Sequence, residues 1–115
     1  MEKKYRIKDS DRIQTILNTR KKKADGFFSV YVATNDANHV RYALSVGKKF
    51  GNAVRRNKIK RRIRMILHNN VDKEVPVDVF IIIRPEAKKL SFGTIEKKLI
   101  KLIKAHNHKL IKTHN

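Results

Sequence analysis

The chain has 115 residues, and its 29 Lys and Arg against 10 Asp and Glu give a formal net charge of +19. This excess is unlike the surface of an average soluble enzyme and makes a polyanion the expected partner. Hydrophobic residues form 40% of the chain, too many for a disordered basic tail, and the absence of Cys excludes disulfides, thiol catalysis and Cys-ligated zinc.

The first predicted element is a short helix that begins near residue 9. Asp9 or Ser10 can cap its amino terminus, because both side chains accept hydrogen bonds from free backbone amides. Ile13, Ile16 and Leu17 then follow at the spacing of a single helical face. This face is expected to contact the core.

Residues 27–34 and 40–46 alternate in hydropathy and predict two strands, which the turn-forming residues 35–38 would join as an antiparallel hairpin. The larger apolar side chains share one face, formed by Phe28, Val30, Val32, Val40, Tyr42, Leu44 and Val46. The other face carries Ser29, Tyr31, Ala33, Arg41, Ala43 and Ser45. On that face Tyr31 could stack on a base and Arg41 could pair with a phosphate. Alternatively, the first helix could cover it, and the pattern supports both interpretations equally.

The centre of the chain predicts a long basic helix over residues 53–69. No acid occurs between residues 37 and 71, and nine basic residues lie between Lys48 and Arg64. A buried stripe is predicted at Ile59, Ile63, Ile66 and Leu67. Two basic edges flank the stripe, one with Asn57, Arg61 and Arg64 and the other with Arg55, Lys58 and Arg62. Like charges at helical spacing repel, so this block indicates an anionic partner, with nucleic acid favoured over an anionic membrane surface.

The last third of the chain predicts a buried strand and a final helix. Residues 77–84 are almost continuously apolar, which is typical of a strand buried on both faces. Ser91 can cap a helix with inward-facing Ile95, Leu99, Leu102 and Ile103, and the tail after residue 106 is expected to fray. The predicted fold is a single α+β domain over residues 1–115, a two-layer sandwich with the order α-β-β-α-β-α.

No pattern in the chain predicts covalent chemistry. The ten acids are scattered, and His106 and His108 would point to different faces of a helix. No phosphate-binding glycine loop or nucleophile turn is present. The longest apolar run has five residues, 79–83, and no apolar signal segment follows the amino terminus, so a cytoplasmic protein without a membrane partner is expected.

The segment KKFGNAVRRNKIKRRIR, residues 48–64, closely resembles the signature of the bacterial ribonuclease P protein subunit. That family carries Arg-Asn-Arg-x-Lys-Arg-x-x-Arg after Gly-Asn-Ala-Val. The matching positions are Arg56, Asn57, Lys60, Arg61 and Arg64, and Lys58 replaces an arginine. Further similarity at residues 5–8, 28–31, 44–49 and 81–87 extends the resemblance over nearly the whole chain.

The resemblance implies a small α+β fold in which the signature helix joins two parallel strands by a left-handed crossover. It also implies a subunit of a ribonucleoprotein endonuclease that removes the 5′ leader from precursor tRNA. A large catalytic RNA would hold Mg²⁺ and perform the hydrolysis. The protein would then bind that RNA and the leader, hold no metal tightly by itself and be monomeric alone.

The resemblance also assigns residues to the two RNA contacts. The implied contacts to the catalytic RNA are Lys48, Lys49, Arg55, Arg56, Asn57, Lys58, Lys60, Arg61 and Arg64. The implied leader cleft lies between the first helix and the sheet and is formed by Lys8, Ile13, Leu17, Tyr31 and Arg41. Family members often have aromatic residues where this chain has Ile13 and Leu17, and a basic residue where Asp9 stands.

Composition alone leaves two other functions open. One is a structural RNA-binding protein, such as a ribosomal protein, with no part in a processing reaction. The other is a basic protein of the membrane surface or the nucleoid. The signature segment favours the ribonucleoprotein endonuclease over both.

Overall fold

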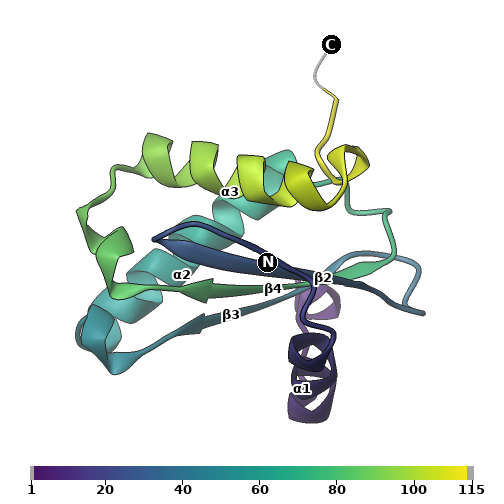
Figure 1. Cartoon of the computed structure of the whole chain (residues 1–115), viewed down its shortest axis with the longest axis horizontal. Coiled ribbons are helices and arrows are strands. Elements are labelled where there is room, and N and C mark those ends of the chain that lie inside the picture. The colour runs from purple at the N-terminus through teal and green to yellow at the C-terminus, as the bar shows by residue number, and fades with distance from the viewer. Residues whose placement is uncertain (1, 114–115) are drawn as a thin grey trace.

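A four-stranded sheet lies at the centre of the structure, a computed structural model that describes residues 2–113 (Figure 1). The strand order is β1-β2-β4-β3, with β1 at Lys22–Ala24, β2 at Phe28–Thr34, β3 at Arg41–Val46 and β4 at Val77–Ile83. The α-helices are α1 Ser10–Asn18, α2 Ala53–Asn70 and α3 Phe92–His106. Short 3-10 helices are η1 Lys3–Tyr5, η2 Lys48–Phe50, η3 Pro85–Lys89 and η4 His108–Leu110.

The pairing of the strands differs from the predicted hairpin. β2 runs antiparallel to β4 and β3 runs parallel to β4, so β4 lies between the two strands and the predicted hairpin is wrong. Six of the seven side chains of β4 are buried, and a strand buried on both faces belongs in the middle of a sheet. The parallel pairing of β3 and β4, with α2 between them in the chain, agrees with the parallel pair that the resemblance implies.

Strand β1 is an addition to the predicted order α-β-β-α-β-α. Its three residues pair antiparallel with β2 at the edge of the sheet, and all three are exposed. Two of them are lysines, which are common on edge strands because they discourage pairing with other chains. Because β1 is short and has no apolar alternation, hydropathy gives no signal for it.

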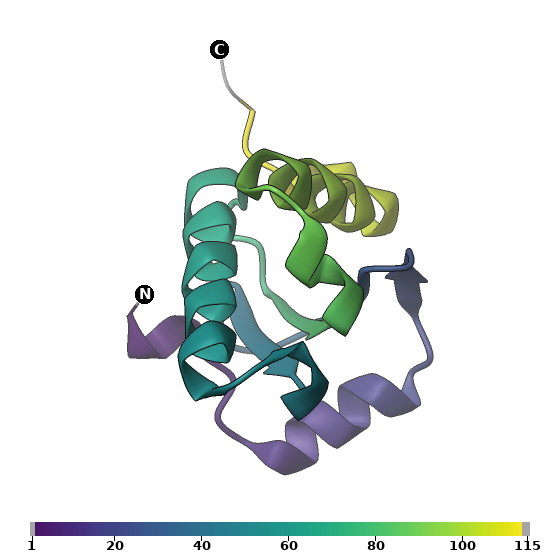
Figure 2. The same ribbon diagram turned by 90° about the vertical axis from the view of Figure 1, so that its left-hand side faces the viewer.

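The sheet has helices on both faces, as the view in Figure 2 shows. The predicted core face of β2 and β3 packs against α2 and α3 in one large cluster, which includes Phe28, Val30, Ile63 and Leu99. On the opposite face, Ile16 of α1 forms a smaller cluster with Ile7 and Phe80. The α+β class is therefore confirmed, and α1 adds a partial third layer to the two that were predicted.

Each of the three α-helices begins at a side-chain cap. The carboxylate of Asp9 accepts a hydrogen bond from the backbone N–H of Asp11 at 2.9 Å, and the Ser91 hydroxyl accepts one from Thr94 at 3.3 Å, both at predicted cap positions. Asn52 caps α2 through the N–H of Arg55 at 3.0 Å. These caps satisfy amides that the helices leave free.

The tail after residue 106 is ordered as far as the structure describes it, so the predicted fraying is wrong there. Leu110 is completely buried, and its carbonyl accepts a hydrogen bond from the N–H of Asp72 at 2.8 Å. The N–H of Lys112 donates to the carbonyl of Asn70 at 2.7 Å. One buried leucine and these backbone bonds hold the tail against the end of α2, whereas residues 114–115 lie outside the described residues.

Candidate nucleic-acid interface

Helix α2 exposes the basic residues of the signature on both sides of its buried stripe. Ile59, Ile63, Ile66 and Leu67 are buried as predicted. The exposed signature side chains are Lys48, Lys49, Arg55, Asn57, Lys58 and Arg61, and the half-buried ones are Arg56, Lys60 and Arg64. Within residues 2–113, no salt bridge joins a basic residue of α2 to a carboxylate. The helix therefore offers two edges of positive charge to an anionic partner.

The two basic edges line two different hollows. The edge with Asn57, Arg61 and Arg64 faces a cavity of about 790 Å³, and the edge with Arg55, Lys58 and Arg62 faces a smaller one of about 210 Å³. Lys88 of η3 adds a further positive charge to the smaller hollow. Grooves in which positive charge predominates concentrate anions, so both hollows favour a polyanionic backbone.

Elements distant in sequence complete the larger hollow, which we call the tyrosine cavity. Helix η1 and the residue after it contribute Tyr5 and Arg6, β3 contributes Tyr42, and the end of α2 with the loop beyond it contributes His68 and Lys73. Sequence reasoning missed these residues, because only the tertiary fold brings the amino terminus alongside α2. Arg6 and Tyr42 pair in an isolated β-bridge, and the N–H of Ile7 donates to the carbonyl of Tyr42 at 2.8 Å.

The residues predicted for the leader cleft divide into an apolar and a basic group. Ile13, Leu17 and Tyr31 all pack against the smaller cluster beneath the sheet. The Tyr31 ring lies 6.2 Å from the ring of Phe80 between centroids, at an interplanar angle of 39°. Tyr31 is half-buried rather than covered, so the structure combines features of both interpretations left open by the sequence.

The basic group lies in a neighbouring groove of about 500 Å³. Lys8 and Arg41 line this groove together with Arg12 of α1, and Lys8 is exposed. Tyr31 is not among the lining residues. The predicted cleft residues thus lie in two places, the smaller apolar cluster and this groove.

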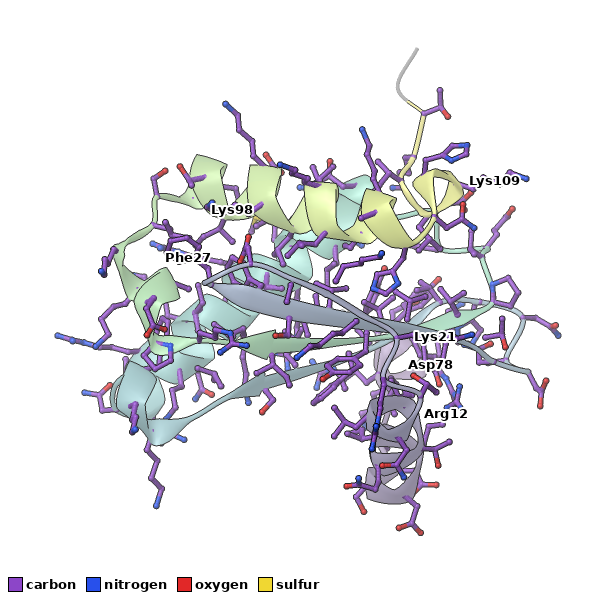
Figure 3. The ribbon with its side chains drawn as sticks, in the orientation of Figure 1. Arg12, Lys21, Phe27, Asp78, Lys98 and Lys109 are labelled. Atoms are coloured by element: carbon purple, nitrogen blue, oxygen red, sulfur yellow. The ribbon has the colours of Figure 1, made fainter. Side chains whose placement is uncertain are left out.

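Arg41 is already engaged inside the protein. Its guanidinium donates to both carboxylate oxygens of Asp78, at 2.8 Å from Nε and 2.8 Å from Nη2. The side chain of Asp78 is fully buried in β4, and it also accepts hydrogen bonds from Arg12 at 2.7 Å and Asn35 at 2.8 Å. Figure 3 shows Arg12 of α1 beside Asp78. Arg41 therefore links β3 to β4 through Asp78, and Arg12 fixes α1 to the same carboxylate.

One feature of the sequence could have predicted the cluster around Asp78. Asp78 is the single acid in an otherwise apolar strand, and a buried carboxylate requires cationic or hydrogen-bonding partners. Burial alone would raise the pKa of Asp78, but hydrogen bonds from Arg41, Arg12 and Asn35 outweigh burial and lower this pKa. The same bond to Asp78 raises the pKa of Arg41.

Two further features of residues 2–113 bear on function. No group of three or more His, Asp and Glu side chains there could hold a metal ion. None of the helices in this part of the chain combines the length and the hydropathy that a bilayer span requires.

Comparisons with known proteins place this fold and signature in one family. The family model for ribonuclease P matches residues 1–107. This chain belongs to the ribonuclease P protein family. The ribonuclease P protein component of Mycoplasma mycoides subsp. mycoides is 44% identical over 106 residues, which cover 90% of this chain and 97% of that protein. The component from Listeria welshimeri is 43% identical, with 90% and 89% covered.

Solved structures of ribonuclease P proteins have the same fold. A Staphylococcus aureus RNase P protein mutant with defective mRNA degradation activity matches with a TM-score of 0.82 and 34% identity, over 97% of this chain and 93% of that one. The RNase P protein from Thermotoga maritima matches with a TM-score of 0.76 and 29% identity, over 87% and 96%. As a ribonuclease P protein subunit, this chain takes part in tRNA processing and works with an RNA subunit and tRNA.

Proposed function

We propose that this protein is the non-catalytic subunit of ribonuclease P and that α2 binds the catalytic RNA. The observation that carries the proposal is the pair of basic edges on α2, which face outward without carboxylate partners within residues 2–113. Two large RNAs repel each other, and a protein of charge +19 lowers that repulsion by releasing their counter-ions. In this proposal the protein is monomeric when alone, and the holoenzyme is cytoplasmic.

The RNA, rather than this chain, holds the Mg²⁺ ions of the reaction. Magnesium binds carboxylate and phosphate oxygens and keeps several of its own water ligands. The buried carboxylate of Asp78 does not fit that role, because three side chains already donate hydrogen bonds to it. Mg²⁺ held by the RNA would supply the activated water, and the protein would position the two RNAs.

Reconstitution tests this division of roles. With Mg²⁺ and the catalytic RNA, the protein should promote release of the 5′ leader from precursor tRNA. With Mg²⁺ but without that RNA, the precursor should remain uncut, as gel analysis of the products would show. Correct cleavage by a preparation shown to be free of RNA would assign the chemistry to the protein and contradict the proposal.

Arg61→Ala combined with Arg64→Ala should prevent holoenzyme assembly at physiological salt while the fold is retained. Arginine forks bind phosphate in a bidentate manner, and these two lie on the same edge of α2. RNA affinity is measured by filter binding, and the fold by circular dichroism. Lys97→Ala with Lys101→Ala removes the same charge from exposed positions of α3 and is the matched control. Equal losses of RNA affinity in the two double variants would show that binding depends on total charge and not on α2.

Tyr31→Ala should weaken holoenzyme binding to precursor tRNA and leave binding to mature tRNA unchanged. Stacking of a leader base on the half-buried ring would contribute about 1–3 kcal/mol, which the alanine removes. Tyr31→Phe keeps the ring and should bind like the wild type. A precursor with a single leader nucleotide should be insensitive to both changes. Equal losses for long-leader, short-leader and mature tRNA, with a lower melting temperature, would make Tyr31 a core residue only.

A further inference from the structure

The tyrosine cavity contains features that a flat basic surface does not need. Its volume of about 790 Å³ is large enough for a nucleotide, and it lies between η1, β3 and α2. Aromatic and apolar side chains lie beside basic ones in its wall. The residues that matter here are Tyr5, Tyr42, Met65, Arg6, Arg61 and Arg64.

Tyr42 lines this cavity and carries an unsatisfied hydroxyl group. The residue is only 4% exposed, and its hydroxyl has no hydrogen-bond partner among residues 2–113. Buried hydroxyl groups nearly always have a partner, so an unpaired one indicates a missing ligand or water. Burial raises the pKa of Tyr42, with a smaller contribution from Tyr5, so the phenol stays protonated and can donate.

Positive charge predominates in the wall of the cavity. Burial lowers the pKa of Arg64, and the nearby charge of Arg6 lowers it further, so the two guanidiniums repel each other. Glu2 is the one acid among the lining residues, and its carboxylate lies 3.9 Å from the ammonium of Lys4. An anion between Arg6 and Arg64 would relieve the repulsion.

The apolar surfaces of the cavity suit a flat ring. The ring of Tyr5 is half-buried and is held edge-to-face against His39, with 5.4 Å between ring centroids. The ammonium nitrogens of Lys4 and Lys73 lie 5.1 Å and 5.5 Å from the centroid of the same ring. Met65 is 54% exposed although it is apolar, and its thioether is a soft contact for an aromatic ligand.

We propose that the tyrosine cavity binds one unstacked nucleotide of RNA. The base would lie against Tyr5 and Met65 and accept a hydrogen bond from the Tyr42 hydroxyl. Its phosphate would lie between Arg6 and Arg64 at the rim. This inference rests on the proposed function, because the nucleotide belongs either to the catalytic RNA or to the precursor tRNA.

Tyr42→Phe tests the hydroxyl contact in the holoenzyme. The change removes one oxygen that has no partner within the described protein, so the melting temperature should stay the same or rise. Affinity for the RNA that supplies the nucleotide should fall about threefold to tenfold, the effect of one lost hydrogen bond. A loss in assembly with the catalytic RNA identifies that RNA as the source. A loss confined to long-leader precursor tRNA identifies the leader, and no loss with either RNA contradicts the proposal.

Single nucleotides test the cavity without either large RNA. The chain has no Trp, so in a Tyr31→Phe variant the fluorescence comes from Tyr5 and Tyr42 alone. AMP, GMP, CMP and UMP should quench this fluorescence to saturation, and Arg61→Ala with Arg64→Ala should weaken the effect. Inorganic phosphate should quench less, since it lacks a base. Absence of saturable quenching by all four nucleotides, or equal quenching by phosphate, would contradict the nucleotide site.

The two experiments separate the cavity from the proposed function. Wild-type protein that does not assemble with the catalytic RNA would contradict the proposed function. The nucleotide titration would still show whether the cavity binds a nucleotide. If Tyr42→Phe assembles and binds precursor tRNA like the wild type, while the α2 double variant loses assembly strongly, the proposed function is retained and the nucleotide site is overturned.

Discussion

Binding of this protein to ribonuclease P RNA should weaken by roughly 10³ to 10⁵ between about 50 and 200 mM monovalent salt, if about six to ten phosphates are contacted. The net charge of +19 and the exposed basic edges of α2 predict an interface dominated by phosphate contacts. Each neutralised phosphate releases counter-ions, and added salt opposes that release. Filter binding over a salt series gives the slope of log affinity against log salt.

The α2 double variant and Tyr42→Phe test which contacts determine the salt slope. Each lost phosphate contact should reduce the salt slope by about 1, so Arg61→Ala with Arg64→Ala should reduce it by about 2. Tyr42→Phe removes no charge and should leave the slope unchanged, whichever RNA supplies the nucleotide. An affinity that hardly responds to salt would contradict a phosphate-dominated interface and favour a mainly apolar one.

Replacement of Asp78 by Ala should lower the free energy of unfolding by about 3–5 kcal/mol, the usual effect of removing one partner from a buried ion pair. The carboxylate is fully buried and is bound by Arg12 and Arg41, so its loss leaves two guanidiniums close together without an anion. Urea unfolding followed by circular dichroism measures the change. Glu86→Gln removes one carboxylate from an exposed position and should have little effect.

The contribution of Asp78 should also depend on pH in a defined direction. The folded protein lowers the pKa of this carboxyl group, so the unfolded chain binds its proton more readily. The stabilisation is therefore fully present above the unfolded pKa of about 3.9 and is lost as the pH falls through the lower folded value. The wild type and Asp78→Asn should differ most at neutral pH and converge in acid. A difference that is constant down to pH 2 would contradict this role.

Much of the fold and of the RNA-binding helix followed from local patterns. The alternation in residues 27–34 and 40–46 separated the two faces of the strands correctly, because side chains on a strand alternate between its faces. The apolar spacing in residues 53–69 identified the buried stripe of α2 and, by exclusion, its two basic edges. These features depend only on residues a few positions apart.

The partners of each element depended on the tertiary structure. β4 separates β2 from β3, although a hairpin would have needed the shorter loop, because burial of both its faces outweighs the cost of a long connection. The tail is held by Leu110, whose binding place at the end of α2 exists only in the folded chain. Hydropathy patterns report which side chains are buried but not which segments bury them.

The same division applies to the functional residues. The sequence by itself determined the charge, the signature and the absence of cysteine chemistry, because these belong to residue identity and local spacing. Only the tertiary structure decided that Asp78 engages Arg41 and that Tyr5 and Tyr42 share a cavity with Arg64. Asp78 and Arg41 lie 37 positions apart, and no local period links them. Long-range contacts of this kind arise from the packing of β3, β4 and the amino terminus, which determines the neighbours available to each charge.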